Sequence, residues 1–156
     1  MSDSILYSGS CFCGEVEFAV IAEPIGRCEC HCTVCQRLSG GPSCLVARFP
    51  GQDSLKVVKG NDMLTEVKTS EEMNRYFCSL CGANMYAITA EHSYCALSSL
   101  KRDDDGKLIH LDRLAPTVHI FYSDRIQNVI DDKPKFATYP SGEPLMIDEK
   151  GNVIAE

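Results

Sequence analysis

Two close cysteine pairs place the strongest restriction on how this chain can fold. Cys11 and Cys13 lie in "GSCFCGE", Cys78 and Cys81 lie in "RYFCSLCGANMY", and sixty-four residues separate the two pairs. A zinc ion bound by four thiolates holds the sulfur atoms about 3.8 Å apart, because each Zn–S bond is about 2.3 Å long. Cys-x-Cys and Cys-x-x-Cys each bring two sulfur atoms together. The pairs therefore predict one closed, structural zinc site.

A glycine follows each pair and supports this interpretation. Gly14 and Gly82 can adopt a positive φ without strain, which suits the tight turn of a metal-binding knuckle. The alternative is that the four thiols are buried apolar groups or a redox dithiol. Two separate close pairs seldom arise in one small domain by packing alone, so we expect the zinc site.

A third group of cysteines, in "CECHCTVC" at residues 28–35, predicts a different kind of site. Cys30, Cys32 and Cys35 form a compact Cys-x-Cys-x-x-Cys unit. If residues 27–32 are extended, Cys28 lies about 13 Å from Cys32 along the backbone, so we expect Cys28 to be a buried neighbour and not a ligand. A zinc ion with three protein ligands keeps a fourth position for water or substrate, which is typical of catalytic sites.

An open thiolate site suits chemistry on a thiol substrate. Bound Zn²⁺ favours deprotonation of an incoming thiol, and the thiolate is the nucleophilic form. His31 lies within the cluster, but strand alternation points it away from Cys30 and Cys32. We expect His31 to support the ligands from outside or to lie at the surface. Cys44 and Cys95 lie in apolar, strand-like surroundings and are expected to be inert core residues.

The chain as a whole predicts a single, mostly β domain over residues 1–156. Its 156 residues are 44% hydrophobic, enough for one core. Short helices are expected at 33–39 and 124–131, and residues 141–156 form either a hairpin or a segment that docks on a neighbouring subunit. Segments with strand-like alternation or β-branched composition are residues 15–22, 43–49, 54–58, 63–68, 73–77, 83–88, 93–100 and 117–122.

Charge and the N-terminal residues limit the partners and the compartment. The net charge of −7 argues against nucleic acid and anionic membranes. The first ten residues lack a basic start followed by an apolar run, and no stretch approaches eighteen apolar residues, so we expect a cytoplasmic protein. Paired thiols in a reducing compartment are more often metal ligands or catalysts than disulfides.

The ordered motifs "GSCFCGEVEFAV", "CHCTVCQRLSGG", "RYFCSLCGANMY" and "APTVHIFYSDR" with "DDKPKFATYP" resemble the glutathione-dependent formaldehyde-activating (Gfa) family, also called the S-(hydroxymethyl)glutathione synthase family. The resemblance runs from about residue 9 to residue 140. Cys28 and the extension 141–156 depart from it. The resemblance implies a β-tent or complex β-sandwich with two zinc sites. They are a closed site on Cys11, Cys13, Cys78 and Cys81 and a catalytic site on Cys30, Cys32 and Cys35.

The resemblance also implies an activity, condensation of glutathione with formaldehyde by a carbon–sulfur lyase. We therefore expect a zinc-dependent lyase that joins glutathione, or a related thiol, to formaldehyde or another small carbonyl. Zinc is expected at both sites, and the three-thiolate site is expected to lose metal or oxidise more readily. Arg37, which follows the cluster, is the candidate contact for the anionic glutathione; Arg27 and Arg48 also lie near it in sequence. A homodimer is compatible with this interpretation.

Two other functions stay open at the level of sequence. A mostly β zinc protein can serve as a non-catalytic binding module for a protein partner. A thiol redox enzyme of the methionine sulfoxide reductase type also pairs Cys-x-x-Cys units around zinc, but it needs an exposed nucleophilic cysteine that is not bound to zinc. His119 in "TVHIFY" matches the family pattern, and we interpret it as a strand histidine with satisfied hydrogen bonds.

Overall fold

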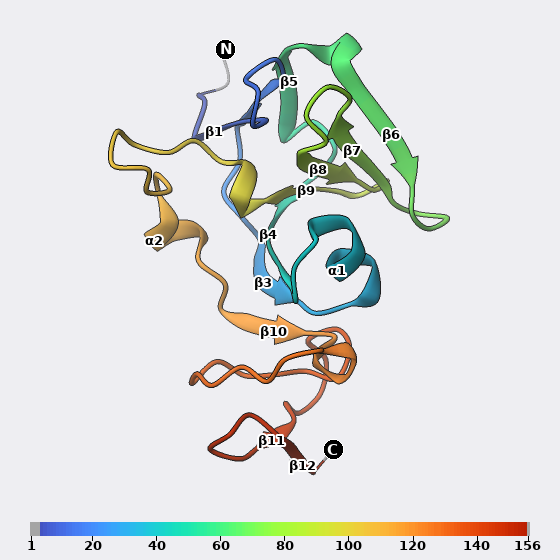
Figure 1. Ribbon diagram of the computed structural model, residues 1–156, viewed down its shortest axis with the longest axis vertical. Coiled ribbons are helices and arrows are strands. Elements are labelled where there is room, and N and C mark those ends of the chain that lie inside the picture. The colour runs from blue at the N-terminus through green and yellow to red at the C-terminus, as the bar shows by residue number, and fades with distance from the viewer. Residues whose placement is uncertain (1–3, 156) are drawn as a thin grey trace. The chain divides into compact units, whose positions relative to one another are not determined.

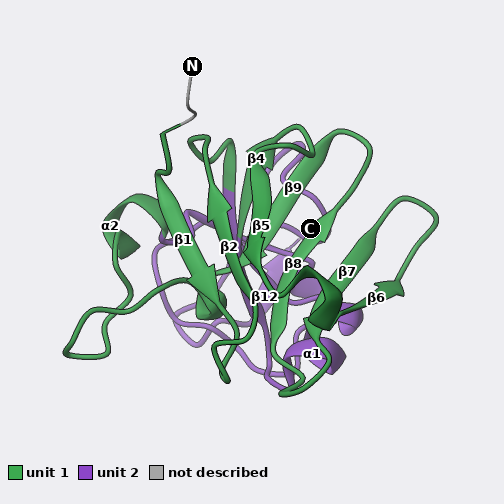
Figure 2. Ribbon diagram, turned by 90° about the horizontal axis from the view of Figure 1, so that it is seen from above, with its two compact units in different colours: residues 1–26, 47–114 green, residues 27–46, 115–156 purple. Residues whose placement is uncertain are grey.

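The computed structural model describes residues 4–155; residues 1–3 and 156 lie outside the described part. The chain divides into two compact units, unit 1 with residues 1–26 and 47–114 and unit 2 with residues 27–46 and 115–156 (Figure 2). Most of the regular structure is strand, so the mostly β fold class is confirmed. The assignment of the whole chain to one domain stays a prediction. No helix among residues 4–155 is long and apolar enough to cross a membrane.

Unit 1 contains two antiparallel groups of strands; Figure 1 labels most of these strands, and Figure 2 labels all of them. The first group has the order β1-β2-β5 and consists of β1 (Tyr7–Ser10), β2 (Glu17–Val20) and β5 (Leu55–Lys59). The second is a meander of β6 (Leu64–Lys68), β7 (Asn74–Cys78), β8 (Asn84–Ile88) and β9 (His92–Ala96). Short helical turns complete the unit: η1 (Asn61–Met63), η2 (Leu97–Ser99) and α2 (Leu111–Leu114).

The core of unit 1 forms where these strands bury their apolar side chains. Phe18, Phe49, Met85 and Leu97 are fully buried there. Burial of such side chains is the main favourable term in folding. Cys11 and Cys78, one from each close cysteine pair, belong to the same core cluster. The predicted closed site therefore borders the best-packed part of the unit.

Unit 2 is built around two short parallel strands and a helix. β3 (Gly26–Cys30) pairs with β10 (Val118–Ile120), with His119 opposite Glu29. α1 (Thr33–Ser39) follows β3 directly, and η3 (Tyr122–Asp124) follows β10. β4 (Cys44–Pro50) begins in this unit and ends in unit 1. The final stretch contains a hairpin of β11 (Met146–Ile147) and β12 (Val153–Ala155), one of the two alternatives expected for it.

The expected helix at residues 124–131 is wrong. The only helical turn there is η3, which ends at Asp124, and no regular element is assigned from 125 to 131. Ile126 and Ile130 are 72% and 74% exposed, so the apolar spacing that suggested a helix has no core to face. Asn128 instead binds the distant backbone carbonyl of Lys150 (3.1 Å).

Candidate functional site

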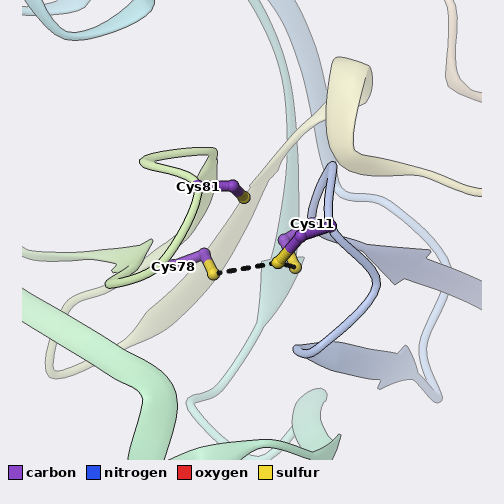
Figure 3. Close-up of side chains that lie close together, drawn as sticks. Cys11, Cys78 and Cys81 are labelled. Atoms are coloured by element: carbon purple, nitrogen blue, oxygen red, sulfur yellow. Dashed lines mark hydrogen bonds between the residues drawn. The ribbon is translucent and has the colours of Figure 1, made fainter.

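The first cysteine cluster brings together Cys11, Cys13, Cys78 and Cys81, whose sulfur atoms lie within 4.8 Å of one another. Cys11 and Cys13 follow β1, Cys78 ends β7, and Cys81 lies in the turn before β8; Figure 3 shows Cys78 and Cys81 facing Cys11. The sulfur atoms of Cys11 and Cys13 are 3.5 Å apart, and those of Cys13 and Cys78 are 3.7 Å apart. These distances agree with the sulfur separation of about 3.8 Å around tetrahedral zinc. The four residues fit a closed zinc site.

Tight turns produce this convergence. The N–H of Gly14 donates to the carbonyl of Cys11 (3.2 Å), and the N–H of Gly82 donates to the carbonyl of Cys78 (2.8 Å). Gly14 has φ +79° and Gly82 has φ +74°, a region in which a side chain is strained. The glycine after each pair thus has the role expected from the sequence.

Backbone donors favour ionisation of two of the four thiols in the first cluster, Cys11 and Cys81. Burial by itself would raise the pKa of Cys11, but the Val16 N–H, which donates to Cys11 Sγ (3.2 Å), and the neighbouring thiols hold that pKa below its ordinary value. Burial also opposes ionisation of Cys81, but hydrogen bonds from the backbone at Ala83 lower the pKa of Cys81 to about 6. Thiolates are the form that binds metal.

The second cluster brings together Cys30, Cys32 and Cys35, again with sulfur atoms within 4.8 Å of one another. Cys30 is the last residue of β3, Cys32 is the N-cap of α1, and Cys35 lies in the first turn of that helix. The Cys32 sulfur accepts the N–H of Cys35 (3.3 Å), as a capping side chain does. A strand end and a helix start thus supply the three thiols. Among the described residues, Cys28 is not a member of this group.

The three thiols of the second cluster share their protons unequally. Contact with Cys30, and then with Cys35, holds the pKa of Cys32 well below its ordinary value. Contacts with Cys32 and Cys35, together with burial, raise the pKa of Cys30. One thiolate therefore forms readily, and further ionisation requires a positive charge in the group. A divalent cation supplies that charge, so the donor set fits zinc.

Other residues named from the sequence have clear positions. Cys28 is partly buried on β3 and lies opposite Val118. Cys44 and Cys95 are buried, as expected for core residues. Arg37 is exposed in the last turn of α1, so its role as a glutathione contact stays a prediction.

A buried polar network in unit 2 was not predicted from the sequence. His31 is 1% exposed and His119 is 0% exposed, and His31 Nε2 lies 2.9 Å from His119 Nδ1. His119 Nε2 lies 2.9 Å from Asp131 Oδ2, and the Lys135 ammonium donates to Asp131 Oδ1 (2.6 Å). Glu29 faces both imidazoles. His31 is therefore not at the surface, and His119 has hydrogen-bond partners as expected.

Electrostatics fix the charges at the two ends of this network. Burial lowers the pKa of His31, which favours the neutral imidazole. Burial of Asp131 would raise its pKa, but hydrogen bonds from Lys135, His119 and Lys133 outweigh this effect and hold the pKa below its ordinary value. The network thus joins a neutral imidazole to an ionised carboxylate that is paired with lysine.

The fold and the two cysteine clusters define a class of protein. It is a mostly β protein with two clusters of thiols that fit metal ions. The particular family follows from comparison with known proteins. The family model described as "Glutathione-dependent formaldehyde-activating enzyme" matches residues 6–124, which include both clusters. The chain belongs to this family, and the resemblance seen in the motifs is confirmed.

Comparison with individual proteins gives two further similarities. A Halomonas elongata protein named "Putative glutathione-dependent formaldehyde-activating enzyme" is 30% identical over 91 residues, which are 54% of this chain and 57% of that protein. The chain thus matches little more than half the length of this curated relative. A crystal structure of a Rhodobacter sphaeroides protein has a TM-score of 0.52 and 24% identity, and the match covers 65% of this chain and 96% of the other. That likeness supports the fold.

Proposed function

We propose that this protein is a zinc-dependent carbon–sulfur lyase. It joins glutathione, or a related thiol, to formaldehyde or another small carbonyl and forms an S-hydroxymethyl adduct. The observation that supports this proposal is the group of three thiols, Cys30, Cys32 and Cys35, in a member of the formaldehyde-activating family. A zinc ion bound there would offer a fourth position to the substrate sulfur and favour loss of its proton.

The reaction forms one bond and needs no oxidant or reductant. The thiol gives up its proton, and its sulfur forms a bond to the carbonyl carbon. The electron pair of the C=O π bond moves to oxygen, which takes a proton from water. The chain's contribution is to hold the sulfur in position and to keep competing water away, because orientation alone can supply a large part of a rate enhancement.

The surroundings of α1 suit this positioning role. The Gln36 side-chain amide donates to the carbonyl of His31 (2.5 Å) and to the carbonyl of Asp124 (2.9 Å). These contacts tie the helix that carries Cys35 to the segment before it and to η3. The ligands of the second cluster therefore sit on a braced helix start, and a braced ligand set holds its geometry during turnover.

Substrate charge points to Arg37. Glutathione is an anionic tripeptide, whereas the chain carries a net charge of −7, so binding requires a local positive group. Arg37 is exposed and lies two residues after Cys35 on the same helix. Its guanidinium can bind a carboxylate through two parallel hydrogen bonds. We place the protein in the cytoplasm, where thiols remain reduced.

The first cluster has a structural role in this proposal. Its four thiols complete a tetrahedral set, which leaves no position for substrate. Zinc there would fix the loop after β1 to the turn between β7 and β8 beside the core of unit 1. The lyase reaction is therefore assigned to the second cluster alone.

A rate assay with two cysteine variants tests the proposal. Adduct formation from glutathione and formaldehyde is followed by NMR, with the reaction in buffer as the baseline. We expect the wild-type protein to exceed that baseline and Cys32→Ser to lose at least about tenfold of the acceleration, since a ligand is removed. The matched control Cys28→Ser, two residues from Cys30, should keep the wild-type rate. A wild-type rate equal to the baseline, or loss of the rate in Cys28→Ser, would contradict the proposal.

A further inference from the structure

We propose that Glu29, His31 and His119 form a third metal site, distinct from both cysteine clusters, for a divalent metal ion such as Zn²⁺. The three donor atoms lie within 4.8 Å of one another. This inference does not depend on the lyase activity, because it concerns different side chains and a different readout.

Strand geometry explains why the three side chains meet. Successive residues of a strand point to opposite faces, so Glu29 and His31 share the face that Cys30 does not use. β10 runs parallel to β3 with His119 directly opposite Glu29, which places both side chains on the same face. The His31 N–H donates to the carbonyl of Ile120 (3.0 Å), which carries the pairing one residue beyond β3.

The distances among the donors agree with a single ion. His31 Nε2 and His119 Nδ1 are 2.9 Å apart, His119 Nδ1 is 3.5 Å from Glu29 Oε2, and His31 Nε2 is 3.9 Å from Glu29 Oε1. Nitrogen and oxygen ligands lie about 2.0–2.1 Å from zinc, so tetrahedral neighbours are about 3.3–3.4 Å apart. The observed values lie on both sides of this separation, and small side-chain rotations would equalise them.

Outer hydrogen bonds orient two of the three donors. Asp131 accepts from His119 Nε2 (2.9 Å), which leaves the lone pair of Nδ1 directed toward Glu29 and His31. A carboxylate that fixes the tautomer of a ligand histidine in this way is a recurring feature of zinc sites. The Ser43 hydroxyl donates to Glu29 Oε1 (2.6 Å) and orients that carboxylate. His31 Nδ1 is buried without a hydrogen-bond partner among the described residues, so the polar contacts of that ring are on Nε2.

The position of the Glu29 carboxylate favours a cation over a simple hydrogen bond. One imidazole can donate a proton to the other, which accounts for the 2.9 Å separation of His31 Nε2 and His119 Nδ1. The Glu29 oxygens, at 3.5 and 3.9 Å, are then too far to accept a hydrogen bond from either nitrogen. A largely buried carboxylate would thus face two imidazole nitrogens that share one proton. Two imidazoles and one carboxylate suit Zn²⁺, whereas Ca²⁺ and Mg²⁺ prefer oxygen ligands.

Crystallography of the full-length wild-type protein with zinc tests the site without any substitution. Anomalous scattering at the zinc edge should give a peak between Glu29, His31 and His119, in addition to peaks at the cysteine clusters. Zinc peaks at cysteine clusters with none between these three residues would overturn the proposal.

Metal counting on variants provides a second test. Glu29→Gln keeps the side-chain shape and an oxygen for Ser43 but removes the anionic ligand, so it should lose one zinc per chain. Its Co²⁺-substituted form should keep the thiolate-to-metal charge-transfer bands of the wild-type protein, which report the cysteine sites alone. Glu143→Gln, an exposed glutamate of the same unit, is the matched control and should keep the wild-type count. Equal zinc content in Glu29→Gln and wild type would refute the third site. Both readouts, the zinc content and the Co²⁺ spectrum, are independent of the reaction rate.

Discussion

Replacing Tyr122 by phenylalanine removes one buried hydroxyl and keeps the ring that packs edge-on against His31. The hydroxyl accepts the N–H of Val129 (2.9 Å) and donates to the carbonyl of Gly151 (3.0 Å). Each hydrogen bond contributes about 0.5–1.5 kcal/mol, so the variant should lose about 1–3 kcal/mol of its free energy of unfolding. For a chain of this size, that loss lowers Tm by roughly 2–12 °C.

Urea denaturation of the zinc-saturated protein, followed by circular dichroism, measures this change. The midpoint should fall while the m-value stays constant, because the surface exposed on unfolding is the same. Tyr94→Phe is the matched control. Tyr94 is half-buried against His92 and has no hydroxyl hydrogen bond among the described residues, so its effect should stay within about 0.5 kcal/mol. A Tyr122→Phe variant as stable as wild type would show that the hydroxyl does not hold the two loops together.

Three other changes separate the roles of individual residues. Cys78→Ser should release one zinc and lower the free energy of unfolding, measured by thermal denaturation, by about 4 kcal/mol or more. Cys95→Ser, at an equally buried position, should keep the wild-type zinc content. Equal zinc content in the two variants would contradict the role of Cys78 as a ligand. Gly82→Ala should lower the free energy of unfolding by about 1–2 kcal/mol, because a side chain is strained at φ +74°. A clash is not the cause, since nothing lies within 4 Å of the added carbon. Unchanged stability would refute backbone strain at this position. Asp131→Asn should destabilise the protein at neutral pH. The folded pKa of Asp131 lies below the ordinary 3.8, so the carboxylate's contribution is present above that value and is lost as the pH falls through the folded pKa. The difference in free energy of unfolding between the wild-type protein and Asp131→Asn should therefore narrow as the pH falls. A difference that does not change with pH would contradict a stabilising role for the ionised carboxylate.

Elements whose ends are set by residues next to them in the sequence could be predicted from the sequence. The helix expected at residues 33–39 has those bounds because both ends are set by neighbours: Cys32 caps the start, and Gly40 ends it with φ +69°. Residues 124–131 have helical spacing but no core to face, and tertiary contacts decide their structure. The sequence predicts a strand over residues 93–100, which is longer than the observed strand. β9 ends at Ala96, and η2 follows, where the Ser99 hydroxyl donates to the carbonyl of Ala96 (2.7 Å).

In the candidate sites, too, contacts between residues close in sequence could be predicted, and contacts that depend on the tertiary fold could not. The cysteine spacing predicted which thiols meet within each pair and within the triplet. The four ligands that zinc requires predicted that the two distant pairs converge. The contact between His31 and His119 joins residues 88 positions apart and depends on the parallel register of β3 and β10. The polar segment "RCEC" gives little sign of a strand, and a parallel partner cannot be read from local composition. The sequence motifs mark both histidines singly, but only the register places them together.

We propose that the zinc ion at Cys30, Cys32 and Cys35 lacks a complete set of protein ligands and accepts the substrate sulfur. X-ray absorption of the zinc-loaded protein, recorded before and after addition of glutathione, tests it directly. We expect the average number of sulfur ligands per zinc to rise with glutathione in the wild-type protein, in Cys28→Ser and in Glu29→Gln, which lacks the third site. A sulfur count that glutathione leaves unchanged would contradict the open site and favour a zinc-stabilised binding module.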